Sequence, residues 1–222
     1  MRHFEEELDQ LRNRLLEMSG LVEDSVYRSV LTLSDKNPEQ AQRVYKNEAE
    51  INRLEIDIDE QATELLTLQQ PVATDMRFLT AGIKINHDLE RMGDLAVNIV
   101  ERSLYLRQEP LITHLVDIPH MANLVRSMVH KSLDAFVRKD PDLARTVLLS
   151  DDAVDELRDA IYEDLIAYME KEPKHVREGV NLMFVARSLE RLADHATNIA
   201  EDVLFLVQGV DVRHHHAQTP TT

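Results

Sequence analysis

The sequence ERMGDLAVNIVERSLYL at residues 90–106 is repeated, with changes, as ERLADHATNIAEDVLFL at residues 190–206. Nine of the seventeen aligned positions are identical, whereas average residue usage gives about one identity by chance. The identical positions include charged residues as well as apolar ones. We therefore predict an internal duplication, in which one structural unit occurs twice in the chain.

Both copies have the residue spacing of a helix. Four polar residues of the first copy are separated by four, four and three positions: Glu90, Asp94, Asn98 and Glu101. This spacing puts them on one helical face. The apolar residues form a separate stripe, made of Ile85, Leu89, Met92, Ala96 and Ile99. At about 100° per residue the two faces are well over 90° apart, so core packing does not require the acidic face.

The first half of the chain is predicted to form three helices. Apolar residues recur every three or four positions over residues 4–34, which indicates one long helix. Asn37 followed by proline is a helix-start signal, and the second helix is predicted over residues 38–68. Residues 69–71 interrupt the pattern. The third helix then carries the first copy of the repeat and is predicted to end near residue 107.

The second half repeats this plan. Met121, Leu124 and Met128 outline a helix that is shorter than the first one of the chain. Asp140-Pro141 reproduces the Asn37-Pro38 cap at an offset of 103 residues, and Glu172-Pro173 marks a break before the last helix. Each half is therefore predicted to be helix, helix, helix with short connections.

The predicted fold class is all-α, with two tandem antiparallel three-helix bundles. The first bundle is predicted over residues 1–109 and the second over residues 117–209. Residues 108–119 contain two prolines and lose the periodicity, so they are the predicted linker. Residues 210–222 are predicted to be a disordered tail.

The composition excludes several classes of function. The formal net charge is −16, from 41 acidic and 25 basic residues, so a role in binding nucleic acid or anionic lipid is not expected. Cysteine is absent, which excludes disulfides and thiolate metal sites and fits a reducing cytoplasm. No apolar run is long enough to span a bilayer, and residues 1–20 lack the apolar core of a signal peptide. We expect a soluble, cytoplasmic protein that contacts a membrane only through partners.

Carboxylates on neighbouring helices form the candidate metal sites. The repeat alignment places Glu48 and Asn52 on the second helix of the first half, and Asp151 and Asp155 at the equivalent positions of the second half. Such oxygen-rich sites suit Mg, Mn, Ca or Fe ions. The candidate metal ligands are Glu48, Glu90, Asp94, Asp151, Asp155, Glu190 and Asp194. The alternative is that these acids merely solvate an exposed face. The spacing alone favours this alternative, and the duplication of the spacing in both halves makes the two interpretations equal.

Other residues give weaker signals. His195 follows Asp194 and is interpreted as a surface histidine, with a position beside metal ligands as the alternative. Arg77 and Arg177 match at the offset of 100, and a salt bridge to a neighbouring helix is expected more than a partner contact. The chain has no glycine-rich phosphate loop and no nucleophile motif, so no catalytic or cofactor-binding residue is predicted.

Three motifs resemble those of the PhoU family of phosphate-transport regulators: QQPVATDMR from Gln69, LERMGDLAVNIVE from Leu89 and ARSLERLADHATNIAED from Ala186. The resemblance covers residues 4–214. It implies two three-helix bundles whose acidic pairs hold surface metal ions such as Fe, Mn, Mg or Zn. Asn52 departs from the family pattern, because it replaces the second acid of its pair.

The resemblance also implies a function. Members of the family are expected to be cytoplasmic, often homodimeric and non-enzymatic. They are expected to bind the ATPase subunit of the phosphate ABC importer and a phosphate sensor histidine kinase, and so to repress the phosphate-starvation response. The alternatives from other classes are a metal-dependent carboxylate-bundle enzyme and a metal-free helical scaffold. The enzyme is disfavoured because paired histidine ligands are missing and the expected site is open to water.

Overall fold

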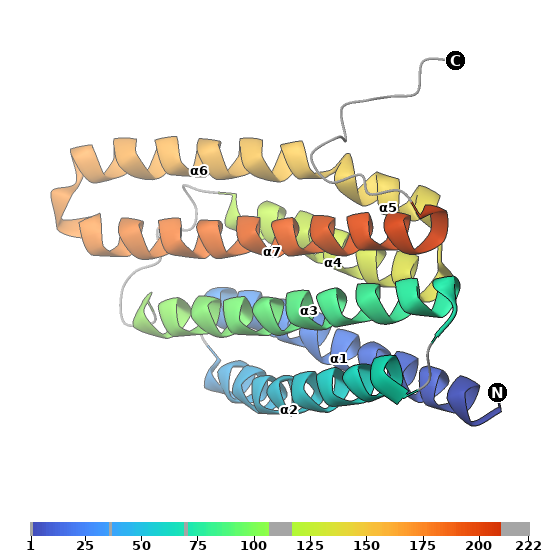
Figure 1. Cartoon of the computed structure of the whole chain (residues 1–222). Helices are drawn as coiled ribbons and strands as arrows, with labels where there is room; N and C mark the ends of the chain where they lie inside the picture. Colours follow the sequence, from blue (N-terminus) through green and yellow to red (C-terminus); the bar gives the residue numbers. More distant parts are fainter. Residues whose placement is uncertain (1, 36, 69–70, 107–116, 210–222) are drawn as a thin grey trace, which may run out of the picture.

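The computed structural model describes residues 2–35, 37–68, 71–106 and 117–209 (Figure 1). The helices, in chain order, are α1 (Arg2–Asp35), α2 (Pro38–Leu68), α3 (Ala73–Leu106), α4 (Ile118–Arg138), α5 (Pro141–Leu148), α6 (Asp151–Lys171), the 3₁₀ helix η2 (Pro173–His175) and α7 (Val176–Gln208). The predicted all-α fold is confirmed. Most of the predicted linker, and the whole of the predicted tail at residues 210–222, lie outside the described residues.

The two proline-containing helix starts have the predicted caps. Asn37 Oδ1 accepts a hydrogen bond from the backbone N–H of Glu39 at 2.9 Å. Asp140 Oδ1 accepts from the backbone N–H groups of Asp142 and Leu143, both at 3.0 Å. Each cap satisfies backbone donors that the first helical turn leaves without an internal partner. The repeated sequence signal therefore produces the same local structure in both halves.

The second helix of the second half is interrupted, and the prediction of one continuous helix there is wrong. It divides into α5 and α6 at Leu149 and Ser150. The Ser150 hydroxyl donates to the carbonyl of Thr146 at 2.8 Å, which is the acceptor that the Ser150 N–H would use in a regular helix. That N–H instead donates to Val147 at 2.9 Å. The side chain thus competes with the backbone and tightens the last turn of α5.

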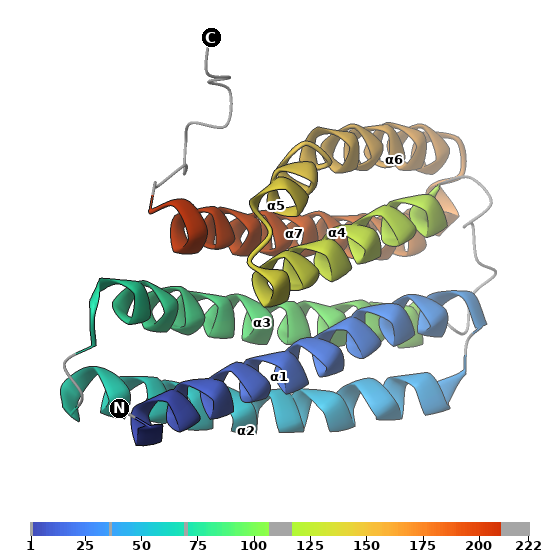
Figure 2. The same cartoon turned by 90° about the vertical axis from the view of Figure 1, so that its right-hand side faces the viewer.

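The helices form two bundles that lie against each other. Helices α1, α2 and α3 contact one another in the first bundle, while α7 contacts α4, α5 and α6 in the second. The bundles meet mainly where α3 lies beside α7, and also where α1 contacts α4. Both views show α3 and α7 as the adjoining helices (Figures 1 and 2). We refer to the α3–α7 contact as the seam.

The apolar stripes that the sequence predicted form the core. On α3, Ile85, Leu89 and Met92 are fully buried, and Leu189 on α7 is as well. The core continues from one bundle to the other, because buried side chains of both belong to one connected cluster. Within the described ranges, no helix has both the length and the apolar character that crossing a membrane requires.

Polar side chains bond across the seam. Lys84 Nζ on α3 lies 2.7 Å from Asp202 Oδ1 on α7. Asp88 Oδ1 lies 2.7 Å from His195 Nδ1 and accepts a hydrogen bond from Asn198 Nδ2 at 3.2 Å. The interpretation of His195 as a surface histidine is therefore wrong, since its side chain is only 16% exposed. Its position beside an acid of the other half could not be read from local sequence.

Candidate metal centre

Three possible ligands converge on the outer side of α2 and α3. Glu55 on α2 and His87 and Glu90 on α3 each offer one ligand atom, and these atoms all lie within 4.8 Å of one another. Glu55 and Glu90 are partly buried, whereas His87 is exposed. Two carboxylates and one imidazole at this separation form a compact set of oxygen and nitrogen ligands.

The carboxylate of Glu90 has an oxygen that the protein leaves unsatisfied. Oε2 of Glu90 is buried and has no hydrogen-bond partner; the nearest cation, Arg91 Nε, lies 3.4 Å away without hydrogen-bond geometry. Burial, followed by the negative charge of Asp94, raises the pKa of Glu90 above its ordinary value. A cation bound by the Glu90 carboxylate would offset this repulsion.

The predicted ligands of the first half are placed in different ways. The negative charge of Asp94 contributes to the raised pKa of Glu90, and Asp94 Oδ2 lies 3.4 Å from Arg91 Nη1. Glu48 Oε1 accepts a hydrogen bond from Asn52 Nδ2 at 2.8 Å. The substitution of asparagine for the second acid therefore gives Glu48 a neutral partner. Its role as a ligand stays a prediction.

The equivalent region of the second half contains an arginine among the acids. Arg158 Nη1 on α6 donates to Asp155 Oδ1 at 2.8 Å and to Glu190 Oε1 on α7 at 3.0 Å. The guanidinium thus joins a predicted ligand of α6 to a predicted ligand of α7. It supplies the positive charge that a metal ion would otherwise provide.

The acids of the second half remain crowded in spite of Arg158. Burial and the charge of Asp194 raise the pKa of Glu190, while Arg158 acts in the opposite direction. Loss of hydration and the charges of Asp151 and Asp155 raise the pKa of Asp194. Acids of α6 and α7 therefore lie near one another, and the role of Asp151, Asp155, Glu190 and Asp194 as metal ligands stays a prediction.

The two halves differ at the positions that the repeat comparison did not select. With the offsets of 103 for α2 and 100 for α3, Glu55 aligns with Arg158 and His87 aligns with Arg187. Glu55 and His87 are not among the residues that both copies share, because arginine replaces each of them in the second copy. The available signal was helical spacing: Glu48, Asn52 and Glu55 share one face of α2, as His87, Glu90 and Asp94 do on α3.

The raised pKa of Asp194 leads to a prediction for stability. A raised pKa means that the folded state holds this proton more tightly than the unfolded state. The resulting stabilisation is present below the ordinary pKa of 3.8 and is lost as the pH rises through the raised value. Asp194→Asn should therefore stabilise the chelator-treated protein at pH 7, by less than about 1 kcal/mol because water screens an exposed carboxylate.

Urea unfolding at pH 7 and at pH 3.5 measures this difference. The gain from Asp194→Asn should shrink at pH 3.5, where the wild-type carboxylate is largely protonated in both states. Glu156→Gln is the matched control, because Glu156 is an exposed acid on α6 and its replacement corrects for the general effect of lowering the negative charge. A loss of stability at pH 7 that exceeds the control would contradict the prediction.

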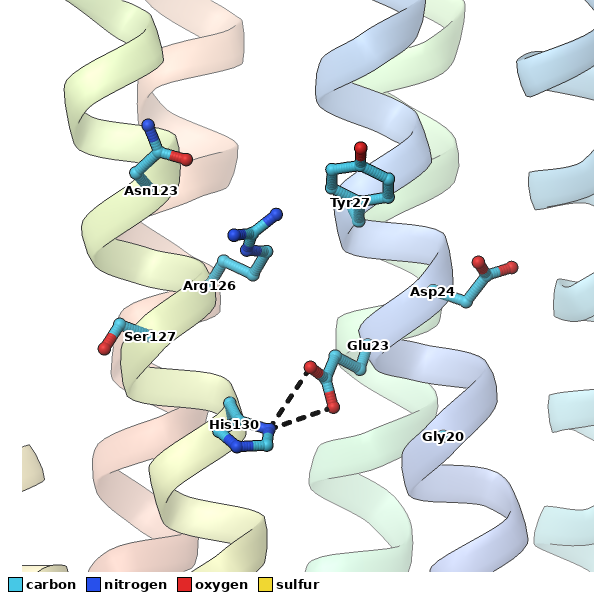
Figure 3. Close-up of a pocket in the computed structure, with 8 residues that line it drawn as sticks. All are labelled: Gly20, Glu23, Asp24, Tyr27, Asn123, Arg126, Ser127 and His130. Carbon is cyan, nitrogen blue, oxygen red and sulfur yellow. Dashed lines mark hydrogen bonds and ion pairs between the residues drawn. The ribbon is translucent and has the colours of Figure 1, made fainter.

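A groove lies away from these acids, between α1 and α4 (Figure 3). It has a volume of about 590 Å³. His130 Nδ1 on α4 lies 3.2 Å from Glu23 Oε1 on α1, and the Arg126 guanidinium lies 5.1 Å from the centroid of the Tyr27 ring. None of the predicted ligands lines this groove. It is therefore separate from the candidate metal centre.

Comparison with known proteins identifies the family of both halves. The model of the PhoU domain matches residues 15–103 and 118–203. The chain is 40% identical over 212 residues to the phosphate-specific transport system accessory protein PhoU homolog of Pseudomonas aeruginosa, covering 95% of this chain and 88% of that protein. It is 37% identical over 210 residues to the homolog of the same name in Aquifex aeolicus, covering 95% of each.

Two crystal structures have the same fold. PhoU from Pseudomonas aeruginosa superposes with a TM-score of 0.88 at 37% identity, covering 93% of this chain and all of that one. The phosphate transport system regulatory protein PhoU from Streptococcus pneumoniae superposes with a TM-score of 0.86 at 28% identity, covering 94% and 99% of the two chains. The similarity therefore extends over both bundles.

Proposed function

Because this chain belongs to the PhoU family, an accessory role in phosphate transport follows, and we propose that the chain is a non-enzymatic regulator of phosphate uptake and signalling. It binds the ATPase subunit of the phosphate ABC importer and a phosphate sensor histidine kinase, and it represses the phosphate-starvation response when phosphate is plentiful. The observation that carries the proposal is the similarity over nearly the full length to proteins named as accessories of phosphate-specific transport.

The structure supports action by contact. The charge of −16 provides an electrostatic field that steers basic surfaces of partner proteins toward the chain and makes their association depend on salt. The candidate metal centre lies on the outer face of α2 and α3, where His87 is 61% exposed. Such an open position suits a surface that partners meet better than chemistry that requires water to be excluded.

The residues of the first half fit a bound metal ion. Glu55, His87 and Glu90 would hold it, with Asp94 adjoining Glu90. The mixed oxygen and nitrogen ligands suit Mn²⁺, Fe²⁺ or Zn²⁺ better than Mg²⁺. When bound, the ion would supply positive charge to the acidic face and tie α2 to α3. In the second half an ion would have to displace Arg158 from Asp155 and Glu190, so we propose weaker binding there.

Deletion of the gene tests the regulatory function. A reporter driven by a phosphate-starvation promoter is expected to be active at high phosphate in the deletion strain, and to be silenced again by the wild-type gene on a plasmid. Co-purification of the wild-type chain with the importer ATPase and with the kinase, from cells grown at high phosphate, tests the proposed contacts. Unchanged reporter activity after deletion would contradict the regulatory role.

A further inference from the structure

One end of the seam carries exposed apolar side chains together with two arginines. On α7, Val176, Val180 and Phe184 recur every fourth residue and are 43%, 38% and 43% exposed. On α3, Tyr105 is 51% exposed. We define the arginine–apolar patch as these residues with the two adjoining arginines: Arg102, Tyr105, Val176, Arg177, Val180 and Phe184. Five of the six line one shallow hollow of about 360 Å³ with Asn181.

The two guanidinium groups lack acidic partners within the described parts of the chain. Arg102 lies over the Phe184 ring, 4.7 Å from its centroid, and its Nη1 lies 3.4 Å from the side-chain oxygen of Asn181. Arg177 is exposed. The two arginines leave donor groups available to an acid from outside.

The duplication shows that the fold does not require this composition. The equivalent end of the seam has Lys84 where the patch has Phe184, and Asp202 where the patch has Arg102. There the two residues form an ion pair at 2.7 Å, so the charge is neutralised within the chain. Arg77 stands at the position of Arg177 in the first copy, so the difference between the two ends lies in the other pair. The same helix pairing is achieved with a Lys84–Asp202 ion pair at one end and with Arg102 stacked on Phe184 at the other.

We propose that the arginine–apolar patch is a docking surface for an acidic, apolar segment of a partner protein. Carboxylates of that segment pair with Arg102 and Arg177, while its apolar side chains cover Tyr105, Val180 and Phe184. Arginine and aromatic residues are the types most often found to dominate protein interfaces. The inference rests on the proposed function, because it assigns the surface through which a regulated partner binds.

The occupant follows from charge complementarity. A basic segment would meet two unpaired cations, while the rest of the acidic surface offers it better sites. An acidic segment gains two charge-assisted contacts at the patch, and the negative charge of the whole chain disfavours its binding to the acidic parts of the surface. The patch is therefore selective because its charge is opposite to that of the whole chain.

Binding assays with charge-reversal variants test the proposal. The probes are the purified importer ATPase subunit and the purified cytoplasmic part of the kinase from the same organism. Arg102→Glu with Arg177→Glu is expected to weaken the binding of at least one of them tenfold or more, which is the size of effect at interface positions that dominate binding. Lys131→Glu with Lys139→Glu is the matched control, because it changes the net charge equally, on α4 and at the residue that caps its C-terminus. It is expected to leave affinity within about twofold.

Two single variants guard against a folding artefact. Arg102 contacts Phe184 and Asn181 across the seam, so Arg102→Glu could also disturb the packing of the two helices. Its effect is therefore compared with the effects of Arg177→Glu and Tyr105→Ala, which change exposed residues. Circular dichroism and unfolding temperature establish that each variant is folded. Both single variants should also weaken binding of the same partner, by smaller factors. If only Arg102→Glu weakened partner binding, the cause would be a disturbed seam, and the proposed docking surface would be overturned.

The outcomes separate this inference from the proposed function. If the wild-type chain binds a partner and the double variant binds equally well, the docking surface is refuted while the regulatory function stands. If the wild-type chain binds neither probe, the proposed contacts fail and the docking surface fails with them. If the double variant instead converts a dimer to a monomer with partner binding unchanged, the patch joins two copies of this chain, and the proposal is overturned.

Discussion

Saturating Mn²⁺ is expected to raise the unfolding temperature of the chelator-treated protein by roughly 5–10 °C. An ion that binds only the folded state contributes about 2.7 kcal/mol when its free concentration is about 100 times the dissociation constant, and 1 kcal/mol shifts the unfolding temperature of a chain of this size by about 2–4 °C. The reason is local. Glu90 carries a buried, unsatisfied oxygen, and the ligand atoms of Glu55 and His87 lie within 4.8 Å of its own.

Glu55→Gln with Glu90→Gln should abolish most of this stabilisation, because both carboxylates of the cluster lose their charge. Calorimetric titration is expected to show a loss of affinity of at least about 100-fold, since even changes in groups behind a ligand cost 10–100-fold. Glu190→Gln is the matched control in the second half, where Arg158 already neutralises the acids. An equal loss in both variants would contradict the proposed difference between the halves.

Leu89→Ala and Leu189→Ala are each expected to lower the free energy of unfolding by about 2–5 kcal/mol. Both leucines are completely buried, and they occupy equivalent positions of the two copies. Removing three carbon atoms from such a site loses hydrophobic burial and leaves a cavity that the surrounding helices fill only in part. Urea unfolding followed by circular dichroism measures the loss.

Leu149→Ala is the control for this pair of variants. Leu149 lies at the turn between α5 and α6 and is 83% exposed, so its truncation should change stability by no more than about 0.5 kcal/mol. If either buried variant were as stable as this control, the claim that these leucines stabilise the fold through core packing would be contradicted. Because the core is continuous between the bundles, both buried variants should affect both halves of the molecule.

The sequence predicted most of the helices because their signals are local. The apolar stripes of α1 and α3 and the caps at Asn37 and Asp140 depend on residues within one or two turns of each other. The break between α5 and α6 was missed because it depends on a competition between the hydroxyl and the N–H of Ser150 for one carbonyl. Helical periodicity does not reveal which of the two groups takes that acceptor.

The candidate metal centre was predicted only in part, for a different reason. Glu90 and Asp94 were selected because the repeat preserves them, and their crowding is present in the structure. Glu55 and His87 were missed because the second copy has arginine at both positions. Asp88 and His195 meet across the seam, and a contact between residues so distant in sequence has no local signal. Comparing the two copies identifies the residues that they share, whereas Glu55 and His87 occur in the first copy only.

The most direct measurement of the proposed metal centre is anomalous scattering from a crystal soaked in Mn²⁺. The strongest peak is expected about 2.0–2.3 Å from ligand atoms of Glu55, His87 and Glu90, with a weaker peak or none beside Arg158. A strongest peak in the second half, or no peak at Glu90, would contradict the account.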